Sequence, residues 1–297
     1  MKFTKGYWMN RPGVEISDVV QIREARLEGN RLYLYTVPYG YDGRAMGGPV
    51  MELYVSAPCE NIIRMEAWHF MGSRQKEPVF DLQIDEKPLR MEEKDGIITV
   101  YSGDTSLVIT KNPASFTYYY KGRRLTSVGE RYGHTMISTI RTPEGSYMRA
   151  QLDLDICEKV YGLGERFTPF VKNGQVIDMW NEDGGTCTEI SYKNIPFYIT
   201  NKNYGVFVNS SDAVSYEICS EMVTRVQFSL PGEKLDFMVI GGEDMKDVLA
   251  NYCTLTGKPA LPPAWSFGLW LSTSWLIGVS SGISVSSPAT FSLFCVL

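Results

Sequence analysis

Histidine is scarce in this chain, with only His69 and His134 among 297 residues. So few histidines argue against a histidine-based metal centre and against a Ser-His-Asp triad. The six cysteines are widely separated and none forms a CxxC pair, so neither a zinc site nor a dense disulfide framework is indicated. We therefore expect reduced thiols, and no bound metal or cofactor.

Concentrated positive charge and an N-terminal apolar stretch are also lacking. The formal net charge is −5 and the lysines and arginines are scattered, so we expect neither nucleic acid nor an anionic membrane as a partner. The first residues, MKFTKGYWMNRPGVEI, lack the continuous apolar run of a secretory signal. Together with the reduced thiols, this predicts a cytoplasmic protein.

A sustained helical period is missing up to about residue 240. Short β-branched or aromatic runs occur there instead, separated by turn residues, and 44% hydrophobic residues suffice for a sizeable core. This pattern predicts an all-β fold, most simply a large antiparallel β-sandwich over residues 1–242. The turn pairs are Gly29-Asn30, Asp95-Gly96, Lys121-Gly122 and Pro231-Gly232.

The pattern changes after Gly242. One apolar helical face is predicted, with acidic residues in its first turn and Gly257 closing the helix. A proline-rich connector over 258–263 leads to FGLWLSTS (267–274), a run typical of a strand buried on both faces. We assign residues 243–274 to this helix, the connector and the start of a second domain. The predicted helical face contains Met245, Val248, Leu249 and Tyr252.

The last 23 residues, 275–297, contain no charged side chain. Residues 276–297 are long enough to span a bilayer, but their serines, glycines and proline make them weakly apolar, and no Lys or Arg flanks them. We do not expect membrane insertion.

The segment 160–200 combines glycines, aromatic residues and carboxylates, which is the mixture that a sugar-binding loop needs. The alternative is an acidic surface loop in which Glu165 and Arg166 form a structural ion pair. The residues alone leave both interpretations open. The glycines that permit tight or left-handed backbone are Gly162, Gly164, Gly174, Gly184 and Gly185.

Four motifs closely resemble glycoside hydrolase family 31, and in particular its bacterial α-xylosidases. They are YGLGERF, WNEDGGT, YKNIPFY and GKPALPPAWSFGLWLSTS. The resemblance extends from the N-terminus to about Ser274. It implies a galactose-mutarotase-like β-sandwich followed by a (β/α)₈ barrel, of which this chain would hold only the first strand, at 267–274.

In such enzymes two aspartates on later barrel strands perform a retaining double displacement. The chain has no Asp or Glu after Asp247, so we assign it no catalytic residue. The resemblance implies that the WNEDGG loop reaches over the barrel mouth, with Asp183 and Trp180 as its substrate-binding residues. Asp183 would accept hydrogen bonds from sugar hydroxyls, and Trp180 would also shape the loop. Glu165 and Arg166 are expected to be architectural.

Three hypotheses follow. The first is the N-terminal domain of an α-xylosidase-like retaining enzyme, inactive as given, whose α-linked xylose or glucose oligosaccharide would bind only the complete protein. The abrupt loss of resemblance after Ser274 would then reflect a frameshift or gene-model error in residues 275–297. The second is a stand-alone carbohydrate-binding or interaction module. The third is an unstable remnant with exposed apolar residues near 267–271.

Overall fold

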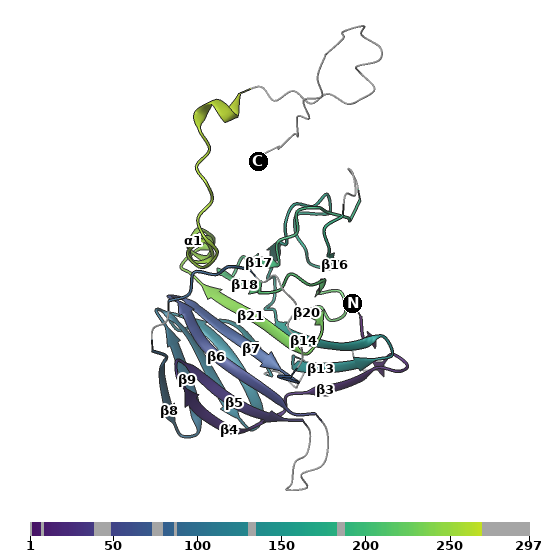
Figure 1. Ribbon diagram of the computed structural model, residues 1–297, viewed down its shortest axis with the longest axis vertical. Helices are drawn as coiled ribbons and strands as arrows, with labels where there is room; N and C mark the ends of the chain where they lie inside the picture. The colour runs from purple at the N-terminus through teal and green to yellow at the C-terminus, as the bar shows by residue number, and fades with distance from the viewer. Residues whose placement is uncertain are drawn as a thin grey trace. The chain divides into compact units, whose positions relative to one another are not determined.

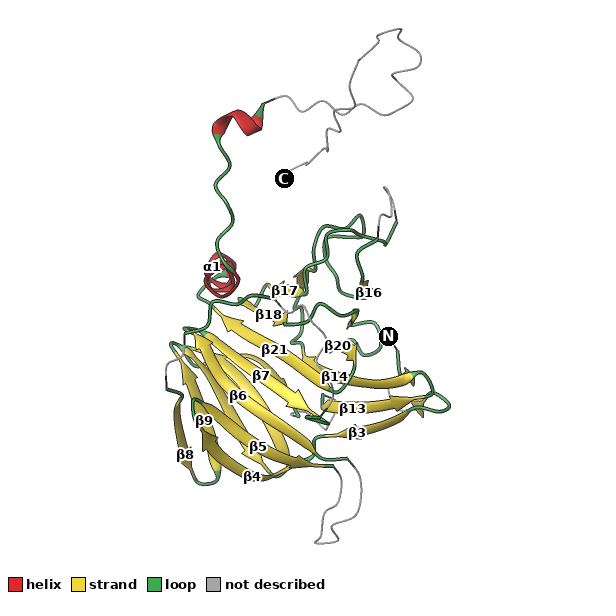
Figure 2. Ribbon diagram, viewed as in Figure 1, coloured by secondary structure: helices red, strands yellow, loops and turns green. Residues whose placement is uncertain are grey.

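The computed structural model of the chain describes residues 2–6, 9–38, 49–72, 80–85, 88–129, 135–182 and 188–268. The chain divides into two compact units, Met1–Gly257 and Lys258–Leu297. Antiparallel strands make up most of the described part of the first unit (Figure 2). The prediction of an all-β sandwich is confirmed.

The described strands form three large sheets and one short hairpin (Figure 1). The eight-stranded sheet has the order β15 (Val160–Gly162), β17 (Phe197–Thr200), β18 (Tyr204–Val208), β21 (Lys234–Gly241), β7 (Ile62–Trp68), β6 (Met51–Cys59), β5 (Arg31–Val37) and β4 (Gln21–Glu28). The six-stranded sheet has the order β16 (Val176–Met179), β19 (Val214–Ile218), β20 (Arg225–Pro231), β14 (Gly145–Asp153), β13 (Ile137–Thr142) and β3 (Glu15–Asp18). The five-stranded sheet has the order β12 (Arg123–Val128), β11 (Ala114–Tyr120), β10 (Thr105–Lys111), β9 (Ile97–Ser102) and β8 (Arg90–Lys94), and the hairpin pairs β1 (Thr4–Lys5) with β2 (Met9–Asn10).

Three of the four predicted turn pairs connect paired strands, whereas Pro231-Gly232 connects β20 to β21, which belong to different sheets. Asp95 and Gly96 join β8 to β9 with φ values of 53° and 77°, and Lys121 and Gly122 join β11 to β12 with φ values of 47° and 77°. Two successive residues with positive φ are characteristic of the type I′ turn, whose twist matches that of the flanking strands. The turn chemistry therefore fixes these hairpins locally.

One continuous apolar core joins all three large sheets. Its members alternate along each strand with residues of the opposite face, as expected where one face of a sheet is buried. Phe228 of β20 and Phe237 of β21 belong to different sheets, and their rings meet edge to face at 5.3 Å between centroids. The core therefore lies between the eight-stranded sheet and the other two.

The predicted helix is α1 (Met245–Thr256), and it packs on the other face of the eight-stranded sheet. The carboxylate of Asp244 accepts a hydrogen bond from the Asp247 amide at 2.9 Å, and Gly257 ends the helix with φ 95°. Tyr252 stacks on Phe197 of β17 at 4.1 Å between ring centroids. Because α1 is anchored in this way, the compact unit includes it and runs to Gly257, beyond the boundary predicted at Gly242.

The apolar face of α1 differs from the prediction at two residues. Leu249 is 46% exposed, whereas Leu255 is completely buried with Val248. The residues of α1 that contact the sheet are therefore spaced three and four apart, and Leu249 lies at the side of this face. Its members are Met245, Val248, Tyr252 and Leu255.

The described part of the second unit contains a 3₁₀ helix, Ala264–Phe267. The strand predicted over 267–274 begins at Phe267, the last residue of that helix, and its residues 269–274 lie outside the described residues. Residues 275–297, including the span considered for a membrane, lie outside them as well. Within the described ranges, no helix is long and apolar enough to cross a membrane.

Candidate functional site

The segment 163–196 joins β15 to β17. It contains WNEDGGT and most of YGLGERF and YKNIPFY. It lies at the same end of the sandwich as α1 (Figure 1). Within it, β16 pairs with β19 of the six-stranded sheet, and Asn181 forms an isolated bridge with Ser191. The segment therefore contacts both sheets at its base.

Glycines are required where this segment leaves β15. Gly162 has φ 100°, and an added Cβ would lie 2.8 Å from the Phe197 carbonyl oxygen. Gly164 has φ 86°, and its Cβ would lie 2.0 Å from the Lys193 carbonyl oxygen. The left-handed backbone predicted for glycines here is confirmed at Gly162, Gly164 and Gly174, while Gly184 and Gly185 lie outside the described residues.

Arg166 ties together three stretches of the segment. Its Nε donates to the Leu163 carbonyl at 3.1 Å and its Nη1 to the Glu189 carbonyl at 3.0 Å. Its Nη2 donates to Oδ1 of Asn194 and, at 3.4 Å, to the Asp178 carbonyl. Partial burial lowers the pKa of Arg166, while the charge of Asp178 acts in the opposite direction. Most hydrogen bonds of the guanidinium therefore go to main-chain carbonyls, and they fix the backbone of the segment.

Glu165 pairs with Lys193 rather than with its sequence neighbour. The Lys193 Nζ lies 2.9 Å from the Glu165 carboxylate, and both side chains are more than half exposed. The ion pair considered between Glu165 and Arg166 is replaced by this pair and by the Arg166–carbonyl contacts. The distribution of these bonds supports an architectural role for both residues.

Asn194 is a second organising residue, and the motif analysis did not single it out. Its Nδ2 lies 2.9 Å from the Trp180 carbonyl oxygen, 2.8 Å from Oδ1 of Asn181 and 2.8 Å from the Ser191 carbonyl oxygen. The amide of Glu182 donates to that same Ser191 carbonyl at 3.1 Å. The only signal in the sequence was the asparagine of YKNIPFY.

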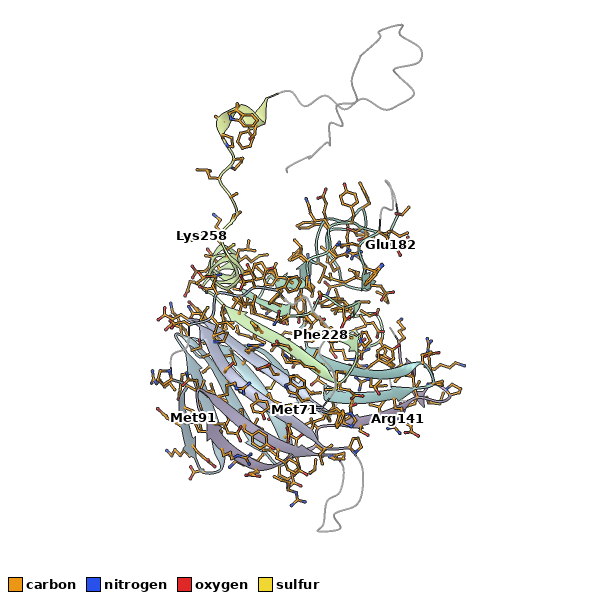
Figure 3. The ribbon with its side chains drawn as sticks, viewed as in Figure 1. Met71, Met91, Arg141, Glu182, Phe228 and Lys258 are labelled. Carbon is orange, nitrogen blue, oxygen red and sulfur yellow. The ribbon has the colours of Figure 1, made fainter. Side chains whose placement is uncertain are left out.

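The segment exposes several large apolar side chains although much of its backbone is hydrogen-bonded. Trp180 is 60% exposed although its carbonyl is hydrogen-bonded, and Glu182, which is labelled in Figure 3, is an exposed carboxylate two residues along the chain. Exposed aromatic faces next to carboxylates are what a sugar ring can stack on and bond to. The large apolar side chains exposed here are Phe167, Phe170, Val176, Trp180, Ile190, Tyr192 and Ile195.

The structure describes one of the two residues assigned to sugar binding. Trp180 is described, whereas Asp183 lies in 183–187, outside the described residues. The role assigned to Asp183 stays a prediction from its motif.

Side chains that could bind a metal ion are scattered over the part of the chain that the structure describes. No group of three or more His, Cys, Asp or Glu side chains is placed there to hold a metal ion. Nδ1 of His69 lies 2.5 Å from the Glu233 carboxylate, while His134 lies outside the described residues. Among the described residues, Cys59, Cys157, Cys219 and Cys253 form no disulfide bond.

Known proteins resemble this chain in sequence and in fold. The family model for the "Glycosyl hydrolase 31 N-terminal galactose mutarotase-like domain" matches residues 52–217. Alpha-xylosidase XylQ of Lactiplantibacillus pentosus is 41% identical over 278 residues, which cover 93% of this chain and 36% of the relative. An alpha-xylosidase of Emericella nidulans is 37% identical over 302 residues, covering 94% and 38%.

Solved structures agree on the fold. The cycloalternan-forming enzyme of Listeria monocytogenes, crystallised with a pentasaccharide substrate, superposes with a TM-score of 0.71 over 86% of this chain and 24% of that enzyme. Its sequence identity of 24% limits that comparison to the fold. The chain spans little more than a third of the length of the two alpha-xylosidases.

Proposed function

Because the chain belongs to glycoside hydrolase family 31, whose N-terminal galactose mutarotase-like domain it matches, we propose that it is part of a retaining α-glycosidase that acts on α-linked xylosides or glucosides. The observation that carries the proposal is the identity to two alpha-xylosidases over more than nine tenths of the chain. Segment 163–196 supports the proposal, because hydrogen bonds from Arg166 and Asn194 fix its backbone and it exposes aromatic side chains. Such a segment suits a surface that completes a sugar site.

In the complete enzyme, Trp180 and Asp183 would contribute to sugar binding. Trp180 offers a ring face on a backbone whose carbonyl is already fixed by Asn194. Asp183 would accept hydrogen bonds from sugar hydroxyls, because an ionised carboxylate offers two acceptor oxygens. The assignment of Asp183 rests on its position in the WNEDGG motif.

The 297-residue chain by itself is expected to have no glycosidase activity. A retaining mechanism requires two carboxyl groups about 5–5.5 Å apart, and the family resemblance assigns both to a barrel beyond this domain. The purified chain should release nitrophenol from nitrophenyl α-xyloside and nitrophenyl α-glucoside no faster than a mock purification from cells lacking it. Hydrolysis that co-elutes with the chain through two columns and follows its concentration would contradict this prediction.

Sugar binding by the isolated domain is a second candidate function, and the exposure of Trp180 and Tyr192 favours it. We expect saturable but weak binding of α-xylosyl or α-glucosyl oligosaccharides, with Kd on the order of 1 mM, in isothermal titration. Trp180→Ala and Asp183→Ala should each weaken binding about tenfold, since stacking on an aromatic ring and a hydrogen bond to a charged group are each worth on the order of 1 kcal/mol or more.

Trp265→Ala is the matched control for that experiment, because Trp265 is also exposed and lies outside the segment. It should leave the affinity unchanged. Absence of any heat of binding at millimolar sugar would remove the stand-alone module as a function, while leaving a role for the segment in the complete enzyme.

A further inference from the structure

Two stretches of segment 163–196, which we call its arms, are joined by hydrogen bonds from the side-chain amide of Asn194. One arm contains Trp180 and Asn181, the other contains Ser191, and Nδ2 of Asn194 bonds to oxygens of all three. Two of these oxygens are main-chain carbonyls, so the contacts fix the path of the backbone in both arms. The two N–H groups of one amide thus hold the base of the loop closed.

Arg166 determines which way that carboxamide faces. A guanidinium only donates hydrogen bonds, so the atom of Asn194 that meets Nη2 of Arg166 must be the oxygen. The amide nitrogen is then directed at the Trp180 and Ser191 carbonyls. Arg166 is itself held by the Leu163 and Glu189 carbonyls, at 3.1 and 3.0 Å.

A surface Trp on an irregular segment would ordinarily lose much conformational freedom on binding a ligand. Here the backbone beside Trp180 is bonded before any ligand arrives, so that part of the entropic cost is met by folding. We propose that Asn194 and Arg166 are positioning residues that preset the Trp180 arm for sugar contact, without touching the sugar themselves. This inference rests on the proposed function only in naming sugar as the ligand.

Close analogues cannot replace either residue. Asn194→Asp keeps the shape and an acceptor for Arg166, but it turns a carboxylate oxygen toward the carbonyls of Trp180 and Ser191. Arg166→Lys offers one compact ammonium on a flexible stem where a planar fork now reaches several oxygens. Both changes should therefore resemble Asn194→Ala in their effect on the loop.

Hydrogen–deuterium exchange of the 297-residue chain tests this directly. In Asn194→Ala, Asn194→Asp and Arg166→Lys, peptides covering 178–182 and 188–192 should exchange roughly tenfold faster or more, because two or more hydrogen bonds that close the loop are lost. The amide of Glu182, bonded to the Ser191 carbonyl, is the reporter inside the first peptide. Core strands such as β21 should keep the protection of the unsubstituted chain.

Glu165→Gln is the matched control, since it removes the exposed ion pair with Lys193 in the same segment and leaves the Asn194 contacts in place. Its loop exchange should be unchanged. Unaltered exchange at 178–182 in Asn194→Ala would overturn the proposal, as would faster exchange spread evenly over the whole sandwich, which indicates a general stabiliser.

Sugar titration of the same variants separates this inference from the proposed function. Where the unsubstituted chain binds sugar, the loop variants should lose about tenfold in affinity while Glu165→Gln does not, and equal affinities would overturn the positioning role. Selective loop exchange without sugar binding by any form would support positioning and count against the domain as an independent sugar binder.

Discussion

The chain carrying Gly164→Ala is expected to be about 3 kcal/mol or more less stable than the unsubstituted chain. An added Cβ would lie 2.0 Å from the carbonyl oxygen of Lys193 and 2.9 Å from the amide nitrogen of Ile195. That carbonyl accepts a hydrogen bond from the Glu165 amide at 3.0 Å, so it cannot withdraw without breaking the contact that closes the segment. For a domain of this size the thermal midpoint should fall by roughly 6–12 °C.

Gly174→Ala is the matched control for Gly164→Ala. Both glycines have φ 86°, but an added Cβ at Gly174 meets nothing within 4 Å. The control therefore carries only the cost of a side chain at positive φ, about 1–2 kcal/mol. Thermal unfolding followed by circular dichroism measures both variants. Equal midpoints would show that the backbone of 193–195 yields to the new methyl group, contrary to the prediction.

Local features of this chain were predictable from its sequence. The pairs Asp95-Gly96 and Lys121-Gly122 occur where the turn residues predict hairpins, because positive φ is decided by the residues of the turn itself. The helix begins after Asp244 and ends at Gly257 for similarly local reasons. Its contact face was predicted less well, because which flank is buried depends on the sheet beneath it, and Leu249 lies on the exposed flank.

The organisation of the candidate site was not predictable in the same way. Arg166 and Asn194 are 28 residues apart, and most of their partners are main-chain carbonyls, which every residue possesses. No residue type marks such an acceptor in a sequence. The neighbouring charges of Glu165 and Arg166 suggested an ion pair, but the chain directs Glu165 to Lys193. The motif identified Trp180. Only the structure shows that its side chain is exposed while its main-chain carbonyl is hydrogen-bonded.

Replacement of Asp153 by alanine is expected to destabilise the sandwich by about 3–5 kcal/mol, because a buried carboxylate with several donors is removed. Asp153 ends β14 of the six-stranded sheet and is 4% exposed. Its carboxylate accepts hydrogen bonds from the Ser127 amide at 2.6 Å, the Ser127 hydroxyl at 3.1 Å and Nη2 of Arg124 at 2.6 Å. The Thr126 hydroxyl donates to it as well, at 3.3 Å, and all of these donors belong to β12 of the five-stranded sheet, so one side chain joins two sheets.

Asp155→Ala, two residues along the chain, is the control for Asp153→Ala. Asp155 is about half exposed, and its carboxylate lies 3.5 Å from Nζ of Lys202 and accepts an exposed hydrogen bond from the Ile156 amide, so its loss should cost about 1 kcal/mol. Urea unfolding should give both variants a single transition, because the apolar core is continuous across the three sheets. A second transition in Asp153→Ala would show that the five-stranded sheet unfolds separately and that Asp153, rather than the shared core, couples it to the rest. An unchanged midpoint would instead show that the core alone holds the sheets together.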